Sequence, residues 1–179
     1  MLVIGGSQGA QVFNENLPGL LSELQNRLGK NIRLNVIHQC GKNNLDDVSR
    51  RYAETGLKFE VQEFIGDMAS AYSVSDVVIC RAGAMTVSEV AAAGAVAVFV
   101  PLPYAIDDHQ FYNAKAMSEN EASLCFRQDD FVAGEWIDDI LALAKDRSSL
   151  ITMAVKARVY ARPDATQQAA DICMEVLNA

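Results

Sequence analysis

A glycine-rich stretch near the start of the chain has the composition of a phosphate-binding turn. It lies between an apolar segment, Leu2 to Ile4, and a helical pattern over Gln11 to Leu28. Glycines permit a tight turn that exposes backbone amides at a helix N-terminus, and a serine hydroxyl adds one more donor for a phosphate oxygen. The alternative is an ordinary strand-to-helix turn in which glycine only eases packing. The candidate phosphate ligands are Gly5, Gly6, Ser7 and Gly9.

The glycine-rich stretch can be compared with three more specific motifs: the Walker loop, the dinucleotide fingerprint and the nucleophile elbow. No G-K-[ST] follows it, which excludes a Walker loop, and its spacing departs from the dinucleotide fingerprint G-x-G-x-x-G. Gly5-x-Ser7-x-Gly9 does match a nucleophile elbow, and Asp76 with His109 would complete a serine-hydrolase triad. Because no earlier loop of the chain supplies an oxyanion-hole amide, the hydrolase is the weaker interpretation.

A second polar stretch, Thr86-Val87-Ser88-Glu89, follows a buried-strand pattern at Val77 to Cys80. Its spacing is that of a capping box, in which Thr86 and Glu89 satisfy each other's backbone amides where a helix begins. In the alternative interpretation, Glu89 turns outward and its carboxylate accepts hydrogen bonds from both hydroxyls of a ribose. The residues by themselves favour the cap.

A third polar cluster, Asp107-Asp108-His109-Gln110 with Asn113 one turn later, enters another helical pattern. Side chains of these types are suited to sugar hydroxyls. The alternative is a solvated loop in which Asp108 caps the helix. The aspartates are adjacent rather than spaced as D-x-D, so a metal-bridged pyrophosphate is not expected.

Strand and helix patterns alternate along the chain, which predicts a parallel α/β sheet with helices on both faces. We expect the first helix to be interrupted near Pro18, because proline lacks the amide that a helix interior needs. His38 lies on an apolar strand and is expected to be a packed core histidine, whereas Met85 fits either a pocket wall or the core. The further strands are expected at 32–39, 59–64, 96–100 and 123–126, and the further helices at 44–54, 66–74, 110–120, 132–144, 149–160 and 165–177.

The composition limits the classes of function. With 179 residues, 50% of them hydrophobic, the chain can form one domain or one half of a two-lobed enzyme. The net charge of −8 argues against binding to nucleic acid and, for this chain alone, to an anionic membrane.

The 4 cysteines lie far apart without clustered histidines, so a zinc site or disulfide framework is not expected and a cytoplasmic setting fits. No apolar run reaches the roughly 20 residues of a membrane span. Because the sequence starts directly on a core strand, we expect a natural segment upstream.

Five longer motifs occur in order along the chain: G-G-S-Q-G-A, H-Q-C-G-K, E-F-I-G-D-M-A-S-A-Y, D-V-V-I-C-R-A-G-A-M-T-V-S-E and D-D-H-Q-F-Y-N-A. Together they closely resemble the C-terminal half of the MurG family. These bacterial glycosyltransferases add N-acetylglucosamine to the lipid-linked muramyl-pentapeptide in peptidoglycan synthesis, which cell wall biogenesis, cell shape and cell division require. The resemblance implies that residues 1–179 form the C-terminal donor-binding lobe of a GT-B glycosyltransferase, with a Rossmann-like parallel sheet and helices on both faces.

The resemblance also implies roles for individual residues. Ser7 and its glycine loop would contact the diphosphate of the donor, Ile65 would hold the uracil through its backbone, and Glu89 would bind the ribose. Gln110, joined by Asn113, would hold the N-acetylglucosamine. The residues expected to surround the nucleotide are Ala84, Met85, Thr86, Val87, Ser88 and Glu89.

The reaction that the resemblance implies is metal-independent transfer with inversion, which converts lipid I to lipid II. The acceptor's 4-hydroxyl attacks the anomeric carbon of UDP-N-acetylglucosamine (UDP-GlcNAc) while UDP leaves. No cofactor, metal or nucleic-acid partner is expected. No catalytic residue is expected either, because the general base and the acceptor site would belong to the other lobe. The chain alone would therefore bind UDP-GlcNAc without turnover, and a non-catalytic nucleotide-sugar binding module is the runner-up.

Location and partners follow from the same resemblance. The full-length enzyme would be a peripheral protein on the cytoplasmic face of the inner membrane. The last helix, within residues 164–179, resembles the segment that returns to the first lobe in this family. Its apolar residues Ile172, Val176 and Leu177 would then be left uncovered, and we expect this helix to be mobile or to take part in a dimer contact.

Overall fold

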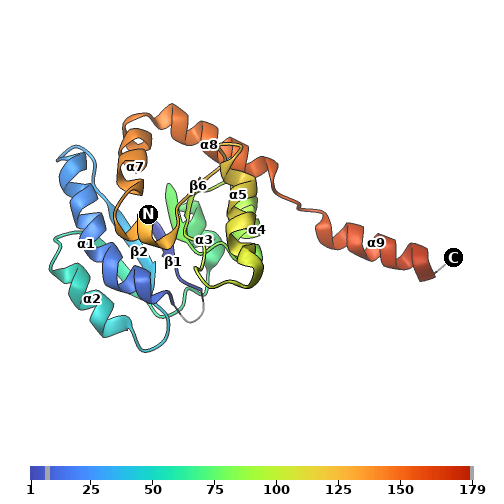
Figure 1. Ribbon diagram of the computed structural model, residues 1–179, viewed down its shortest axis with the longest axis horizontal. Coiled ribbons are helices and arrows are strands. Elements are labelled where there is room, and N and C mark those ends of the chain that lie inside the picture. Colours follow the sequence, from blue (N-terminus) through green and yellow to red (C-terminus); the bar gives the residue numbers. More distant parts are fainter. Residues whose placement is uncertain (7–8, 178–179) are drawn as a thin grey trace.

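The computed structural model describes residues 1–6 and 9–177 of the chain (Figure 1). Their core is a six-stranded sheet with the strand order β3-β2-β1-β4-β5-β6. Every neighbouring pair of strands is parallel. The order reverses between β1 and β4, and parallel sheets of this type bind ligands at that reversal, beyond the carboxyl ends of the strands. The strands are β1 (Leu2–Ile4), β2 (Asn35–Gln39), β3 (Lys58–Gln62), β4 (Val77–Cys80), β5 (Val96–Phe99) and β6 (Leu124–Cys125).

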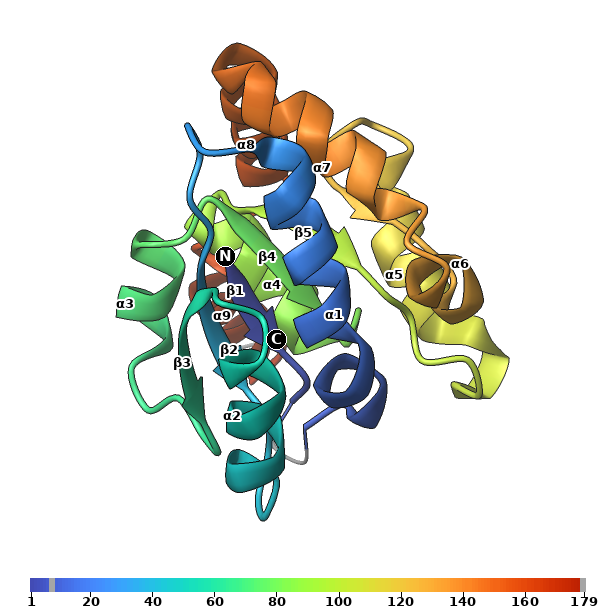
Figure 2. The same ribbon diagram turned by 90° about the vertical axis from the view of Figure 1, so that its left-hand side faces the viewer.

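Helices cover both faces of the sheet, as the alternation of elements predicts, so the expected fold class is confirmed. Figure 2 views the molecule from the face that carries α1 and α2. The same face carries α6 and α7, whereas α3, α4 and α5 pack on the other face and α8 contacts both α7 and α4. The helices are α1 (Gln11–Leu28), α2 (Leu45–Ala53), α3 (Met68–Ser73), α4 (Ala84–Ala93), α5 (His109–Ser118), α6 (Gln128–Val132), α7 (Trp136–Lys145), α8 (Arg147–Val159) and α9 (Ala165–Leu177).

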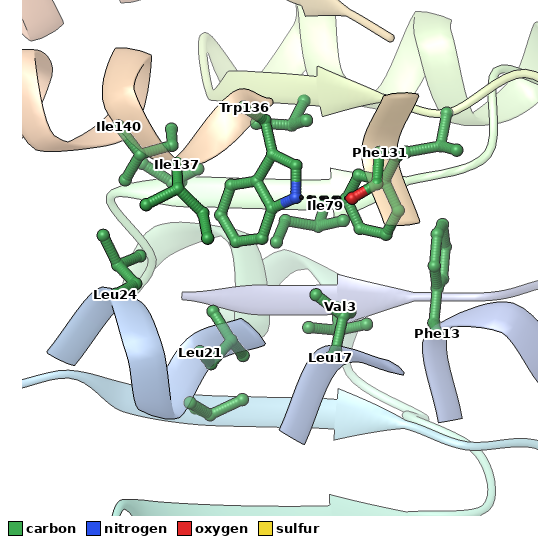
Figure 3. Packing of buried hydrophobic residues seen from close by; sticks show 14 of the residues in the cluster. Val3, Phe13, Leu17, Leu21, Leu24, Ile79, Phe131, Trp136, Ile137 and Ile140 are labelled. Atoms are coloured by element: carbon green, nitrogen blue, oxygen red, sulfur yellow. Dashed lines mark hydrogen bonds between the residues drawn. The ribbon is translucent and has the colours of Figure 1, made fainter. Parts of the chain in front are cut away.

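The pleat of the strands divides the core into two clusters. Val3 and Ile79 point towards α1 and α7, whereas Leu2 and Val78 point towards α3 and α4. Because successive side chains of a strand point to opposite faces, strands buried on both faces are apolar throughout. The α1 side contains the bulkiest packing, with the Trp136 indole stacked on Phe131, as Figure 3 shows.

Two expectations for the helices are wrong. α1 runs without interruption through Pro18, which costs one helix hydrogen bond but is itself buried with the apolar face of the helix. The helix expected over 132–144 begins only at Trp136, as α7, and Val132 belongs to the short helix α6, which was not expected. Gly134 between them has φ +82°, a left-handed conformation that ends a helix, so Val132 closes α6 and Trp136 opens α7.

The last helix extends away from the body of the molecule (Figure 1). No residue of α9 is buried, and Ile172, Val176 and Leu177 are 61%, 73% and 77% exposed. The expectation that these three side chains are uncovered is confirmed. Within the described ranges, no helix has both the length and the apolar character to cross a membrane.

Candidate functional site

A cleft with a volume of about 730 Å³ lies at the carboxyl edge of the sheet, at the reversal between β1 and β4. The starts of α1 and α4 and one side chain of α5 face each other across it. Three of the expected glycines, Gly5, Gly6 and Gly9, line it, and so does Gln110. The other lining residues are Ala10, Gln11, Val12, Glu15, Arg81, Gly83, Thr86, Leu102 and Gln128.

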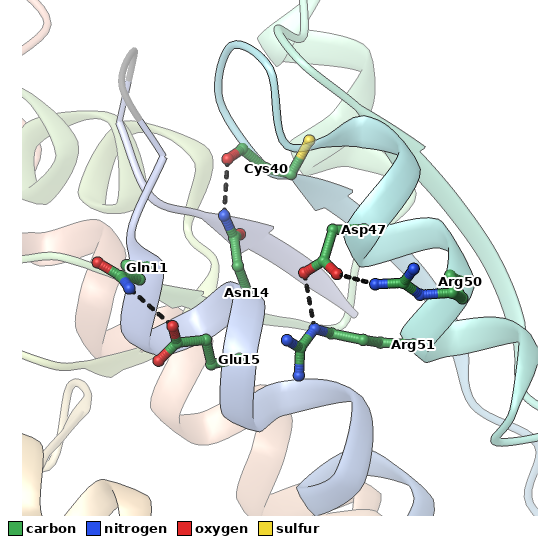
Figure 4. A network of polar contacts seen from close by, with 7 residues as sticks. All are labelled: Gln11, Asn14, Glu15, Cys40, Asp47, Arg50 and Arg51. Atoms are coloured by element: carbon green, nitrogen blue, oxygen red, sulfur yellow. Dashed lines mark hydrogen bonds and ion pairs between the residues drawn. The ribbon is translucent and has the colours of Figure 1, made fainter.

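The first wall of the cleft is the N-terminus of α1. Its cap residue is Ala10, which has no side-chain acceptor, so the amides of Gln11 and Val12 have no partner inside the helix. The helix start is held by Asn14, whose Nδ2 donates to the carbonyl oxygen of Cys40 at 2.9 Å, as Figure 4 shows. Unpaired amides and the helix dipole make such an end attractive to an anion.

Two glycines are required by the turn between β1 and α1. A Cβ on Gly9, which has φ +72°, would lie 2.0 Å from the carbonyl oxygen of Cys40. A Cβ on Gly5 would lie 2.1 Å from the amide nitrogen of Ala10. Only glycine permits the backbone to approach these atoms so closely, so the two glycines are required by the shape of the turn and do more than ease packing. Ser7, the expected diphosphate ligand, lies outside the described residues.

The second wall is the N-terminus of α4, and here the expected capping box is wrong. α4 begins at Ala84 with Gly83 as its cap residue, so Thr86 is already inside the first turn and Glu89 is in the second. The first amide with a helical partner is that of Val87, which donates to the carbonyl oxygen of Gly83 at 3.0 Å. The three preceding amides are left without a capping side chain.

Glu89 is exposed and is held from one side. The Tyr72 hydroxyl donates to its Oε2 at 3.2 Å. Burial, reinforced by the Glu89 charge, raises the pKa of Tyr72, so this phenol remains a donor. Within the part of the chain that the structure describes, Oε1 of Glu89 has no hydrogen-bond partner, so that oxygen is open to a ligand.

The side chains of Gln110 and Asn113, on α5, form hydrogen bonds with the turn after β4 and, for Gln110, with the loop after β5. Oε1 of Gln110 accepts from the backbone amides of Ala82 at 3.3 Å and Leu102 at 3.1 Å. Nδ2 of Asn113 donates to the carbonyl oxygen of Ala82 at 3.1 Å. Because two amides occupy the Gln110 oxygen, its NH₂ group carries the two donors that remain for a ligand in the cleft.

Asp108 occupies the cap position of α5 but does not cap it, so that alternative is wrong. Its carboxylate oxygens accept instead from Nη1 and Nη2 of Arg127 at 2.9 and 2.6 Å. These hydrogen bonds hold the pKa of Asp108 below its usual value.

The remaining expected nucleotide residues lie around α4. The Ile65 side chain is 4% exposed and packs with the cluster that contains Leu2, while no hydrogen bond to its backbone N–H or C=O is present among the described residues. Met85 is 74% exposed, which excludes a place in the core. Ala84 and Ser88 are also exposed, and Thr86 and Val87 are half-buried.

Arg81 was missed by the sequence analysis, although it directly follows the buried strand β4. Its Nη1 donates to the carbonyl oxygens of Val100 and Pro101 at 3.1 and 3.2 Å, and its Nη2 donates to Oε1 of Gln128 at 2.8 Å. Burial lowers the pKa of Arg81, and none of the salt bridges between described residues includes it. A half-buried cation with neutral acceptors adds positive potential to the floor of the cleft.

The serine-hydrolase alternative is wrong. Asp76 precedes β4 and therefore lies at the amino edge of the sheet, whereas His109 opens α5 on the cleft side. The Asp76 carboxylate accepts from Nη1 of Arg147 at 2.6 Å. The described residues contain no group of three metal-ligating side chains. His38 is the expected core histidine, fully buried with Nδ1 at 2.9 Å from the Tyr52 hydroxyl.

Comparisons with known proteins agree with this arrangement. Residues 1–173 match the family described as "Glycosyltransferase family 28 C-terminal domain". The chain is 44% identical, over 178 residues, to the UDP-N-acetylglucosamine--N-acetylmuramyl-(pentapeptide) pyrophosphoryl-undecaprenol N-acetylglucosamine transferase of Marinobacter nauticus, covering 99% of the chain and 48% of that protein. It is 47% identical to the transferase of the same name from Alcanivorax borkumensis, again covering 99% of the chain and 48% of the relative. The chain thus spans about half the length of the curated relatives it matches.

Solved structures give the same result. The crystal structure of Acinetobacter baumannii MurG matches with a TM-score of 0.86 and 43% identity, over 97% of this chain and 49% of that one. The calicheamicin glycosyltransferase CalG4 matches with a TM-score of 0.56 over 99% of this chain and 41% of its own, but at 20% identity it supports the fold alone. The resemblance to the C-terminal half of MurG is confirmed.

Proposed function

The chain belongs to the family of glycosyltransferase family 28 C-terminal domains, and from this premise we propose that it is the donor-binding half of a UDP-GlcNAc-dependent transferase. The complete enzyme moves N-acetylglucosamine to the C4 hydroxyl of lipid-linked MurNAc-pentapeptide, which is the step from lipid I to lipid II. One observation carries the proposal most directly: α1 and α4 begin at the same cleft, and no side chain of the described residues caps either helix start.

The diphosphate of the donor binds between these two helix starts. Each start supplies unpaired backbone amides and the positive end of a helix dipole, and the Arg81 guanidinium adds positive potential from below. Ser7 contributes its hydroxyl from the glycine loop. When the bond to the sugar breaks, negative charge grows on the β-phosphate, and groups already fixed in place stabilise it without reorganisation.

The two ends of the donor are held by separate groups. Oε1 of Glu89 accepts from the ribose while Tyr72 holds Oε2, and the exposed Met85 borders the nucleotide. The backbone of Ile65, which forms no hydrogen bond with other described residues, pairs with the uracil. At the other end, the NH₂ group of Gln110 donates to the N-acetylglucosamine, while Asn113 holds the turn at Ala82.

The acceptor and the general base belong to the other half of the complete enzyme. The chain alone therefore binds UDP-GlcNAc but does not turn it over. The uncovered side of α9, with Ile172, Val176 and Leu177, packs on that other half or, in its absence, on a second copy of the chain. The complete enzyme acts at the cytoplasmic face of the inner membrane, where its lipid-linked acceptor resides.

Titration of the chain with UDP and UDP-GlcNAc by calorimetry, with ¹⁵N NMR mapping, tests the proposal. We expect weak binding of both ligands, with shifts at the starts of α1 and α4, and much weaker binding of UMP, which lacks the second phosphate. Absence of binding at millimolar donor would contradict the proposal. Joining the chain to the N-terminal half of the Acinetobacter baumannii relative should yield transfer to a lipid-linked acceptor. Binding without transfer in that fusion would favour a non-catalytic module.

A further inference from the structure

Arg127 links the loop before α5 to the segment that follows β6. Its guanidinium forms the two-fold hydrogen-bonded pair with Asp108, and its Cζ lies 3.8 Å from the ring centroid of Phe111. A bidentate arginine–carboxylate pair that also stacks on an aromatic ring fixes orientation as well as distance. Asp108 and Phe111 stand on either side of Gln110 in the sequence, so both contacts hold the segment that presents this residue to the cleft.

The turn that Arg127 holds has an unfavourable backbone. Asp107 and Asp108 have φ values of 52° and 53°, a left-handed conformation that side-chain-bearing residues rarely adopt. Such residues persist where the surrounding contacts hold them in place. Within the loop, the amide of Asp108 donates to the carbonyl oxygen of Ala105 at 3.0 Å. The pair with Arg127 ties the same residue to the β6 side of the sheet.

We propose that Arg127 is a positioning residue for the donor sugar. By holding Asp108 and Phe111, it keeps Oε1 of Gln110 on the amides of Ala82 and Leu102 and so directs the NH₂ group of Gln110 into the cleft. The inference rests on the proposed function, in which Gln110 binds the sugar. Without Arg127 the turn relaxes and the sugar loses a fixed donor, whereas the nucleotide contacts at α1 and α4 remain.

The first test compares two ligands in the variant Arg127→Ala. The affinity for UDP-GlcNAc should fall about tenfold, the effect of losing one well-placed hydrogen bond, while the affinity for UDP changes less than about twofold. Arg127→Lys keeps the charge but not the two-pronged geometry and should show an intermediate loss. Arg51→Ala removes a surface hydrogen bond to Asp47 on α2, far from the Gln110 loop, and should change neither affinity (Figure 4). Equal losses for UDP and UDP-GlcNAc in Arg127→Ala would overturn the proposal.

A second test needs no ligand and separates the two proposals. The amide of Leu102 donates to Gln110, so its hydrogen exchange reports whether Gln110 stays in place. Exchange of this amide should be about tenfold faster in Arg127→Ala and in Asp108→Asn, and the double variant should add little, because both changes break one pair. Unchanged exchange would overturn the role of Arg127 even if the donor binds. Faster exchange in a chain that binds no nucleotide would contradict the proposed function and leave the loop attachment supported.

Discussion

The Tyr72 hydroxyl, on α3, donates a 3.2 Å hydrogen bond to Oε2 of Glu89 on α4. Glu89 is exposed, and its other oxygen, Oε1, has no hydrogen-bond partner among the described residues. A carboxylate that is held by a hydrogen bond to one oxygen can accept hydrogen bonds from ligand hydroxyl groups at the other oxygen.

The variant Glu89→Ala should weaken binding of UDP by about tenfold or more, because a charge-assisted hydrogen bond contributes about 1.5–3 kcal/mol. Binding of 2′-deoxyuridine diphosphate should weaken much less, since this ligand lacks one of the two hydroxyls that we propose donate hydrogen bonds to Glu89. Calorimetric titration of both ligands measures the difference. Tyr72→Phe serves as the companion variant, with a smaller loss in the same direction. If UDP and its deoxy analogue lost equal affinity, Glu89 would have no role at the ribose.

Gly9→Ala should destabilise the protein by several kcal/mol, because the new Cβ would collide with the carbonyl oxygen of Cys40 and φ is positive at this position. Gly19→Ala is the matched control: this glycine lies inside α1 with nothing within 4 Å of the added Cβ. It should stabilise the protein by up to about 1 kcal/mol through helix propensity. Urea unfolding measures both variants, and a well-tolerated Gly9→Ala would mean that the loop does not need this close approach.

Acid should destabilise the protein through His38. Burial lowers the pKa of this imidazole to about 3, against a usual value of 6.5, so the folded state keeps it neutral while the unfolded state takes up a proton. Its stabilising contribution is therefore complete above about pH 6.5 and is lost as the pH falls, with a slope approaching about 1.4 kcal/mol per pH unit. Unfolding free energies between pH 6.5 and 5, where carboxylates titrate little, isolate the effect.

The control for this pH dependence is His38→Gln, which can still hydrogen-bond to the Tyr52 hydroxyl but does not titrate. Its unfolding free energy should be nearly flat over the same interval. A slope equal to that of the unmodified chain would assign the acid sensitivity to other groups.

Removal of residues 163–179 should change the unfolding free energy by no more than about 0.5 kcal/mol, because α9 buries no residue on the rest of the chain. Sedimentation should show less self-association for the shortened chain, since the exposed side of α9 is then absent. A large loss of stability would show that α9 packs on the rest of its own chain. Unchanged self-association would show that α9 has no part in the contact between two copies.

The sequence predicted the layers of the fold better than the starts of its helices. Strand and helix alternation and the phosphate-type turn needed only local patterns of apolar residues and glycine. The start of α4 did not follow from Thr86 and Glu89, because the extended backbone of Gly83 lets the helix begin three residues earlier than the side chains suggest. Gly134 similarly separates α6 from α7, so that α7 begins four residues later than expected.

The supporting contacts of the site could not be read from local sequence. Arg81 reaches Gln128, and Arg127 reaches Asp108, only because β4, β5 and β6 are neighbours in the sheet. Tyr72 and Glu89 meet because α3 and α4 pack together. Such partners depend on tertiary packing between segments far apart in the chain. Arg81 was the exception with a usable signal, since it follows directly on a buried strand at the expected crevice.

All the strands of the described sheet point the same way, and this separates two tasks in space. The helix starts and loops that line the cleft occupy one rim, whereas the ion pair of Asp76 and Arg147 and residue Met1 lie at the opposite rim. Substitutions at the first rim can therefore reshape the cleft while the buried layers of the sheet and helices stay as they are.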